Sequence, residues 1–241
     1  RSNSIYSLLV DDRGAVWVGH FQAGLDYSLY QNGLFRTYAY PPQFNSANLS
    51  IRSFVNRGPE KVIGSRDGLF YINEATGIVK SFVKPVLTSD LILTICFYEG
   101  EYYIGTYGGG MMVLNPQTLS LKYFTQGDTE LFQKGHIFCV KPDNRGNLWI
   151  GTSQGLFCYN GQTKQIKNFT STNSQLPEGN VYEVSFDSTG KGWIATETGM
   201  CIYDPASQSL RSNVFPEGFV HKDKVRTIYE DAEQAGATGV F

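Results

Sequence analysis

The sequence has little charge, no long apolar run and no helical periodicity. Only 17% of its 241 residues are charged, and the formal net charge is -2. Because a nucleic-acid partner needs a basic surface, this balance argues against nucleic acid as a partner. No apolar run reaches the roughly 18 residues of a membrane-spanning helix, so we expect no membrane contact from this chain itself. The absence of a 3.6-residue period excludes a helical solenoid.

Cysteine and histidine are also scarce, and neither has the spacing of a metal site. The four cysteines lie in apolar segments and form no C-x-x-C pair; they are Cys96, Cys139, Cys158 and Cys201. We expect buried free thiols, because Cys139 and Cys158 fall on the first and third strands of one predicted sheet, about 9.5 Å apart. The three histidines are scattered at positions 20, 136 and 221. We therefore predict no metal and no other cofactor.

What the sequence does contain is 14% aromatic residues, 26 glycines and a repeated motif. The clearest copy, at residues 143–156, is DNRGNLWIGTSQGL. Related segments occur at 11–19 and 187–195, and weaker ones at 60–64 and 101–105. The last residue of the motif falls at Gly19, Gly64, Gly105, Gly151 and Ala195, in steps of 45, 41, 46 and 44 residues. A period of this length predicts a protein built of similar units.

Each unit predicts four strands joined by turns. The units open with an apolar strand, and these strands begin at Ile5, Ile51, Ile92, Ile137, Val181 and Val225. A turn rich in Asp, Asn and Gly leads to the second strand, a second Gly leads to the third, and the fourth is shorter and more polar. In a propeller blade the inner strands are covered on both faces by neighbouring blades. We therefore predict an all-β fold, a β-propeller of four-stranded antiparallel blades.

The blades are expected at residues 1–46, 47–87, 88–132, 133–176 and 177–220, with a partial sixth at 221–241. The sixth unit has no Trp-Ile-Gly segment, and Gly239-Val240-Phe241 resembles the start of a third strand. Either this hairpin is shortened, or residues are missing between Asp231 and Gly239. Because five blades and a fragment leave the ring unclosed, we expect the chain to be part of a larger, seven-bladed propeller.

The pattern Asp-x-x-Gly-x-x-Trp-Ile-Gly-Thr-x-x-Gly-Leu at residues 143–156 resembles the two-component regulator propeller repeat. The resemblance covers nearly the whole chain and implies the periplasmic sensor region of a hybrid two-component histidine kinase, an inner-membrane protein. It implies that this chain is not an enzyme and that kinase activity lies elsewhere in the full-length protein. It also implies an oligosaccharide ligand from polysaccharide breakdown and a signal that controls transcription. A homodimer formed through the full-length sensor is compatible with the resemblance.

The loops between the second and third strands contain the candidate ligand-binding residues, because the repeats differ there. In a propeller these loops and the longer connections between units lie at one end of the axis. The candidates are His20, Phe21, Arg66, Asp67, Tyr107, Gln154 and Glu197. Their aromatic, basic, acidic and amide groups suit a sugar ring, its hydroxyls or a uronate carboxylate. A solvated loop without a ligand is an equally good interpretation.

The most strongly patterned side chains are interpreted as structural. Trp17, Trp149 and Trp193 recur at one position of the repeat, which indicates packing within the propeller. The aspartates that open the turns are expected to cap them; they are Asp11, Asp143 and Asp187.

Two other classes of function remain open. One is a propeller enzyme, a polysaccharide lyase or hydrolase, with acid or base roles for His20, Arg66, Tyr107 and Glu197. Against it, the sequence has no G-x-S-x-G, HExxH or paired acidic motif. The other is a propeller that only binds another protein.

Overall fold

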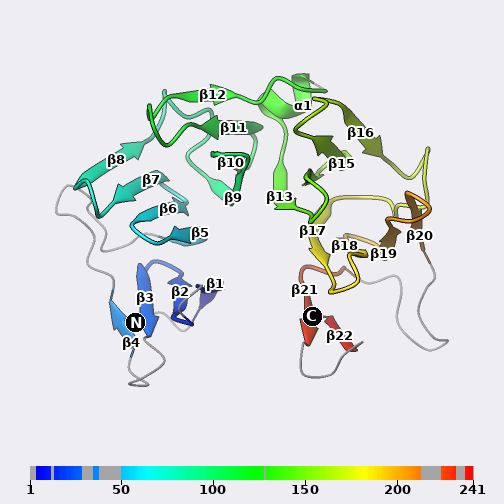
Figure 1. The fold of residues 1–241 in the computed structure, drawn as a ribbon, viewed down its shortest axis with the longest axis horizontal. Coiled ribbons are helices and arrows are strands. Elements are labelled where there is room, and N and C mark those ends of the chain that lie inside the picture. Colours follow the sequence, from blue (N-terminus) through cyan, green and yellow to red (C-terminus); the bar gives the residue numbers. More distant parts are fainter. Residues whose placement is uncertain are drawn as a thin grey trace.

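The strands form five four-stranded sheets and one two-stranded sheet, all antiparallel, within the residues that the computed structural model describes. Those residues are 4–11, 14–28, 35–37, 50–127, 129–212, 224–231 and 237–240. The sheets follow one another in an arc, with the first strand of each sheet on the inner side and the fourth on the outer side (Figure 1). This arrangement confirms the predicted all-β propeller of four-stranded antiparallel blades.

Within each sheet the strands follow the order of the sequence. The first sheet contains β1 (Ile5–Val10), β2 (Val16–His20), β3 (Leu25–Ser28) and β4 (Phe35–Thr37). The second contains β5 (Ile51–Arg57), β6 (Glu60–Ser65), β7 (Gly68–Asn73) and β8 (Ile78–Phe82). The third contains β9 (Ile92–Tyr98), β10 (Glu101–Thr106), β11 (Met111–Leu114) and β12 (Leu121–Tyr123). The fourth contains β13 (Ile137–Pro142), β14 (Asn147–Thr152), β15 (Gly155–Asn160) and β16 (Ile166–Phe169). The fifth contains β17 (Val181–Phe186), β18 (Gly192–Thr196), β19 (Gly199–Asp204) and β20 (Ser209–Arg211). The sixth contains β21 (Ile228–Asp231) and β22 (Ala237–Val240).

A bulge near the start of the first strand recurs in all five four-stranded sheets. In β13, Ile137 pairs with Thr152 and Cys139 pairs with Gly151, so Phe138 is an extra residue without a partner in the ladder. The same shift occurs in β1, β5, β9 and β17. An extra residue of this kind interrupts the alternation of side chains between the two faces of a sheet.

The hydrophobic core lies between consecutive sheets. Each of its five clusters combines residues of two neighbouring sheets. Trp149 of β14 is 1% exposed, and its ring centroid lies 4.5 Å from that of Tyr203 in the fifth sheet. Trp17 packs in the same way on Phe54 of the second sheet, at 5.0 Å. The structural interpretation of the tryptophans is confirmed, and the sheets stabilise one another by burying these apolar faces.

The turn aspartates also have the predicted structural role. Oδ1 of Asp143 accepts hydrogen bonds from the backbone N–H groups of Arg145 and Asn147, both at 2.8 Å. Its Oδ2 accepts a hydrogen bond of 2.9 Å from the indole Nε1 of Trp149. The same indole bond, also 2.9 Å, joins Trp17 to Asp11 and Trp193 to Asp187. One carboxylate therefore caps the turn and satisfies the N–H of a packed tryptophan.

The glycine that ends the motif stands where two sheets approach closely. A β carbon on Gly151 would lie 2.5 Å from Sγ of Cys139 and 2.7 Å from the carbonyl oxygen of Val181 in the next sheet. At Gly105 it would lie 2.7 Å from a side-chain carbon of Ile137. The repeated Gly is therefore explained by packing between sheets.

Two parts of the chain differ from the sequence-based expectation. β22 pairs directly with β21, with Tyr229 opposite Gly239, so Gly239 lies in a second strand and does not begin a third. The connection between the third and fourth sheets contains a helix, α1 (Thr129–Lys134), whose Leu131 and Phe132 are buried between those sheets. A helix of six residues is too short to produce a recognisable period.

The first sheet leaves one apolar face uncovered. Leu8 of β1 is 66% exposed, whereas the residues at the same position of the later sheets are between 0% and 8% exposed; they are Phe54, Ile95, Val140 and Val184. Those four residues contact the preceding sheet. In Figure 1, β1 and β21 lie on either side of the opening of the arc. The face of β1 that includes Leu8 is therefore apolar like the faces that a preceding sheet covers in the later sheets.

Candidate functional site

A cavity of about 210 Å³ lies on the inner side of the arc, and each of the five four-stranded sheets contributes one residue to it. The lining residues are Tyr6, Arg52, Leu93, Phe138, Tyr182 and Arg226. The first five are the extra residues of the bulges. Arg226, one residue after Val225, has the corresponding position in the segment that precedes the sixth sheet. We call this cavity the axial pocket, because the first strands that form it surround the centre of the arc (Figure 1).

The bulges explain why these side chains reach the axis. In the second, fourth and fifth sheets the residue before the bulge is fully packed between sheets; Ile51, Ile137 and Val181 are each 0% exposed. The residue after it faces the close approach at the motif glycine, as Cys139 does beside Gly151. Strict alternation would direct the side chain of the residue between these two into a neighbouring sheet. Because that residue is the extra residue of the bulge, its side chain points towards the centre of the arc.

The axial pocket combines aromatic rings with positive charge. The guanidinium carbon of Arg52 lies 4.7 Å from the ring centroid of Tyr6, and that of Arg226 lies 5.0 Å from the ring centroid of Tyr182. Phe138 contacts the ring of Tyr182 edge-on, with centroids 5.2 Å apart. Cation–π contacts restrict the orientation of a guanidinium without using its hydrogen-bond donors. The six lining residues include two guanidinium groups and no carboxylate.

Next to the pocket, Glu197 is held in place by three neighbours. Its Oε2 accepts a hydrogen bond of 2.9 Å from Nδ2 of Asn180, and its Oε1 accepts one of 3.3 Å from the hydroxyl of Tyr182. Nζ of Lys224 lies 3.2 Å from Oε1. The hydrogen bond from Lys224 lowers the pKa of Glu197, and hydrogen bonds with Tyr182 and Glu197 raise the pKa of Lys224. The charges of Glu197 and Lys224 therefore offset each other. The positive charges of the two arginines that line the pocket are not offset by this pair.

An imidazole lies beside Phe138. The ring of His136 stacks on Tyr107 with a centroid distance of 4.0 Å, and its centroid lies 6.1 Å from that of Phe138. Nδ1 of His136 and Nε of Arg52 are buried, and neither has a hydrogen-bond partner among the described residues. Buried polar atoms are normally satisfied, so these two atoms leave hydrogen-bonding capacity near the pocket.

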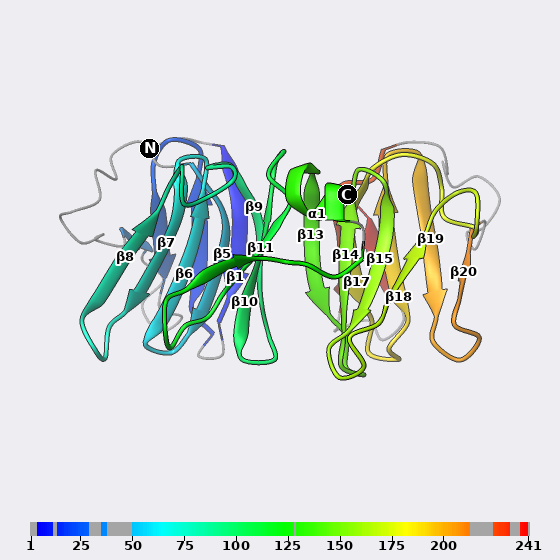
Figure 2. The same ribbon diagram turned by 90° about the horizontal axis from the view of Figure 1, so that it is seen from above.

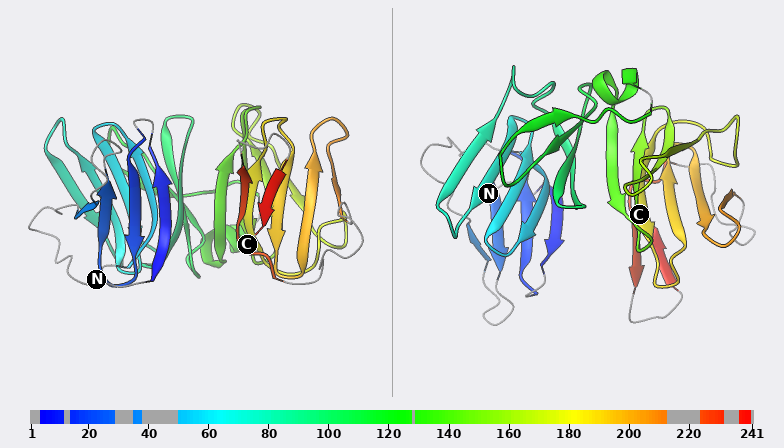
Figure 3. Two further views of the ribbon diagram at one scale, coloured as in Figure 1. Left: turned by 90° about the horizontal axis from the view of Figure 1, so that it is seen from below. Right: turned by 45° about the horizontal axis from the view of Figure 1, so that its top comes forward.

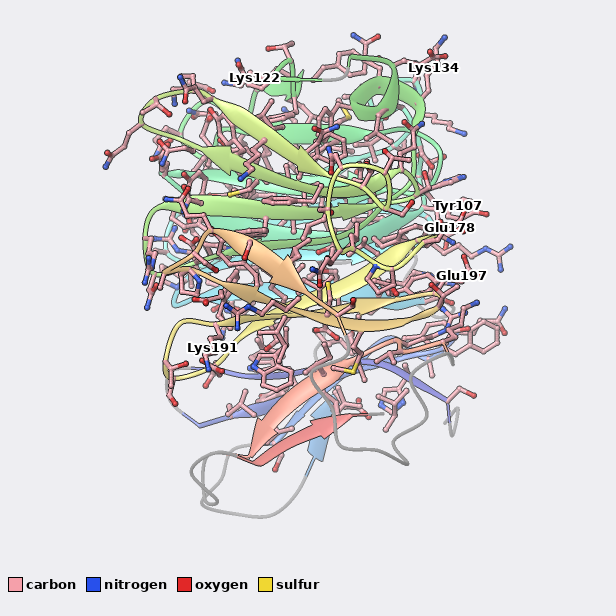
Figure 4. The ribbon with its side chains drawn as sticks, turned by 90° about the vertical axis from the view of Figure 1, so that its right-hand side faces the viewer. Tyr107, Lys122, Lys134, Glu178, Lys191 and Glu197 are labelled. Carbon is pink, nitrogen blue, oxygen red and sulfur yellow. The ribbon has the colours of Figure 1, made fainter. Side chains whose placement is uncertain are left out.

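The pocket lies at the end of the molecule where the variable loops are found. Backbone hydrogen bonds join each loop between the second and third strands to the residue before the first strand, as from Tyr107 N–H to the carbonyl of Leu91 at 3.0 Å. The strands run between the two ends of the molecule (Figures 2 and 3). Tyr107, Glu178 and Glu197 lie along one end, and Lys191 of a turn between first and second strands lies at the other (Figure 4). This confirms that the variable loops and the longer connections share one end.

Three of the seven predicted ligand-binding residues contact either a residue that lines the axial pocket or His136 beside it. Phe21 packs edge-on against Tyr6 with centroids 5.4 Å apart. Tyr107, 50% exposed, stacks on His136, and Glu197 bonds to Tyr182. Loop positions in the first, third and fifth sheets thus adjoin the axial pocket.

The other four predicted residues lie elsewhere. His20 contacts β3, where its Nε2 lies 3.2 Å from Oδ2 of Asp26, and its position is that of the buried Thr152 in the fourth sheet. Arg66, Asp67 and Gln154 have exposed side chains on loop tips. A ligand-binding role for the seven residues stays a prediction. The four residues with suggested acid or base roles have separate contacts: His20 with Asp26, Tyr107 with His136, Glu197 with Lys224, and Arg66 with solvent.

The pocket residues were not predicted from the sequence, although they have a recognisable signal. Each directly follows the Ile or Val that opens a first strand, and this second position varies from Tyr to Arg, Leu and Phe. An arginine at 52 or 226, next to a buried apolar residue, is the clearest departure from the pattern. Only the shared bulge reveals that this position faces the axis.

The cysteines are free thiols at the predicted places in the sheets. Cys139 lies on β13 and Cys158 on β15, the first and third strands of the fourth sheet. Burial raises the pKa of each of the four thiols to about 12. Among the described residues, no three of His, Cys, Asp and Glu are grouped to hold a metal ion. Nor is any helix in the described ranges long and apolar enough to cross a membrane.

Comparisons agree with the repeat and the fold. The sequence profile of the family described as "Two component regulator propeller" matches residues 1–22 and 132–154, so the chain carries two-component regulator propeller repeats. The curated proteins include no match.

Among solved structures, the chain is similar to the extracellular domain of the hybrid two component system BT3049 from B. thetaiotaomicron. The TM-score is 0.73 at 24% identity, covering 95% of this chain and 31% of that one. The corresponding domain of BT4673 from the same organism gives a TM-score of 0.65 at 18% identity, covering 96% of this chain and 36% of that one. The computationally designed Ika8 protein gives a TM-score of 0.64 at 13% identity, covering 94% of this chain and 65% of that one. The chain thus spans about a third of the two extracellular domains, and the likeness supports the propeller fold.

Proposed function

We propose that the chain is part of the extracellular, periplasmic sensor region of a hybrid two-component system and recognises an oligosaccharide released by polysaccharide breakdown. The observation that carries the proposal is the axial pocket, to which the five four-stranded sheets and the segment before the sixth each contribute one aromatic, aliphatic or guanidinium group. The two-component regulator propeller repeats and the similarity to two extracellular sensor domains support the sensor role.

The chemistry of the pocket suits a sugar. Aromatic faces such as those of Phe138 and Tyr182 pack on the apolar face of a pyranose, while guanidinium donors bind its oxygens. A volume of about 210 Å³ is smaller than the ~300 Å³ at the lower end of sites for drug-sized ligands. The pocket therefore fits one residue of an oligosaccharide, and the rest of the ligand would lie over the loops that carry Phe21, Tyr107 and Glu197.

The signalling chemistry would lie outside this chain. In the proposed arrangement a kinase elsewhere in the full-length protein responds to a change in the geometry of a sensor homodimer and so controls transcription. Such a change in geometry would follow if neighbouring sheets moved together around a bound ligand. A ligand shifts the equilibrium between two conformations only when it makes different contacts with each of them.

Calorimetric titration of the full-length protein's extracellular region with plant and host oligosaccharides tests this function. We expect saturable binding of at least one oligosaccharide and no cleavage products after prolonged incubation. Absence of saccharide binding at millimolar concentration, together with binding of a protein, would favour a protein-interaction propeller. Cleavage of the oligosaccharide, abolished in His20→Ala, would favour a propeller enzyme.

A further inference from the structure

We propose that the axial pocket selects an anionic sugar, and that Arg52 and Arg226 together bind its carboxylate or sulfate group. This inference rests on the proposed function and names the class of saccharide. Both guanidinium groups line the same cavity of about 210 Å³, although Arg52 belongs to the second sheet and Arg226 precedes the sixth. Their positions follow from one structural rule, the inward residue at the start of each first strand.

Each guanidinium is oriented mainly by an aromatic ring. Arg52 lies over Tyr6 and Arg226 over Tyr182, and Nε of Arg52 has no hydrogen-bond partner among the described residues although it is buried. By contrast, Lys224 is paired with Glu197 at 3.2 Å. A guanidinium held over a ring keeps the planar fork of N–H groups that matches a carboxylate or sulfate.

Two acidic residues near the pocket, in the part of the chain that the structure describes, already have partners. Glu197 is engaged by Lys224, Asn180 and Tyr182. Glu183, the next residue after Tyr182 on β17, accepts a hydrogen bond of 3.2 Å from the backbone N–H of Ile228 with its Oε2. The two pocket arginines therefore supply positive charge that no carboxylate in the lining offsets. A neutral sugar would leave this charge unused, whereas an anionic sugar gains from it.

The aromatic residues of the pocket define where the rest of the sugar ring lies. Phe138 and Tyr182 come from adjacent first strands and contact each other at 5.2 Å, and Arg226 covers the Tyr182 ring. A pyranose that packs on Phe138 thus places its substituents within the same cavity as the guanidinium groups. Recognition would combine stacking on one side with a charge-assisted hydrogen bond on the other.

The test compares three probes in titrations of the extracellular region of the full-length protein. The probes are α-1,4-trigalacturonate, the neutral α-1,4-galactotriose of the same length and linkage, and a sulfated galactose disaccharide that contains no uronic acid. We expect an acidic probe to bind at least about tenfold more tightly than the neutral one, in line with a charged hydrogen bond. The preferred probe distinguishes a carboxylate from a sulfate ester. Binding of the acidic probe should weaken as salt concentration rises.

Variants locate the binding group. Arg226→Gln and Arg52→Gln should each lower affinity for the acidic probe by about tenfold or more. Arg145→Gln, which removes an exposed arginine from a turn between first and second strands, should leave it unchanged. Melting temperatures establish that each variant folds. Because Arg226 is exposed and Arg52 partly buried, Arg226→Gln keeps the test valid if Arg52→Gln does not fold.

The outcomes separate this inference from the proposed function. Equal binding of the neutral and acidic probes, unaffected by Arg226→Gln, would overturn the anionic selectivity and leave an oligosaccharide sensor in place. Failure of every saccharide in the wider library to bind would overturn the sensor function itself, and the inference with it. Tight binding of an acidic probe that Arg52→Gln and Arg226→Gln leave intact would place the anion site elsewhere.

Discussion

The indole N–H of Trp149 donates a hydrogen bond of 2.9 Å to Oδ2 of Asp143, and the ring packs 4.5 Å from Tyr203 of the next sheet. The most conspicuous residues of the repeat therefore join a turn to the packing between sheets. Because the first, fourth and fifth sheets share this arrangement, it accounts for the Asp and Trp that their repeats have in common. Recognition is left to positions where the units differ.

Trp149→Ala should destabilise the protein by about 3 kcal/mol or more, because it leaves a cavity between the fourth and fifth sheets. Gln154→Ala, at the exposed tip of the loop five residues after Trp149, should change the unfolding free energy by less than about 0.5 kcal/mol. Denaturant unfolding monitored by circular dichroism measures both. Equal stabilities of the two variants would contradict the packing described for β14.

Asp187 should make stability depend on pH below neutrality. Burial acts to raise its pKa, but hydrogen bonds from Thr189, Trp193 and the backbone of Lys191 outweigh it, so the folded-state pKa is below the model-compound value of 3.8. A lowered folded-state pKa stabilises the protein above the unfolded-state pKa, and this contribution is lost as pH falls through the folded-state pKa.

We therefore expect Asp187→Asn to be less stable than the wild type at pH 7, with a difference that shrinks below about pH 4. Denaturant unfolding across this pH range measures the difference. A stability difference that stays constant down to the acid limit of folding would rule out this contribution of the carboxylate.

The thiols should be unreactive in the folded protein. Burial raises the pKa of Cys139 and of Cys201 to about 12, so almost no thiolate forms at pH 8. A thiol reagent at pH 8 should modify these two residues only after denaturation, and all four cysteines should then titrate without a reductant. Titration of only two thiols in the denatured chain would reveal a disulfide.

The repeat was sufficient to predict the strands, because local chemistry determines them. Asp143 and Gly146 specify a turn, and the apolar residues on either side specify the strands that flank it. The error at Gly239 arose because a glycine before an apolar pair occurs at the start of a third strand as well as inside a second one. Without the pairing to Tyr229, the two cases look alike.

The axial pocket could be predicted only in part, because it depends on contacts between sheets. Phe21, Tyr107 and Glu197 were predicted from the variability of their loops, and they adjoin the pocket. Arg52 and Phe138 were not, since alternation along a strand assigns them to a sheet face. The bulge that redirects them forms where adjacent sheets meet closely, and the sequence of one strand does not contain that information.

Phe138→Ala tests most directly whether the axial pocket is the recognition site. Phe138 lines the pocket, whereas Tyr123, on the outer strand β12, is an exposed aromatic residue at the rim. In titrations with an oligosaccharide that the wild type binds, Phe138→Ala should lose affinity by about tenfold or more through lost stacking, while Tyr123→Ala should bind as the wild type does. Unchanged affinity in a folded Phe138→Ala variant, or an equal loss in Tyr123→Ala, would contradict recognition at the axis.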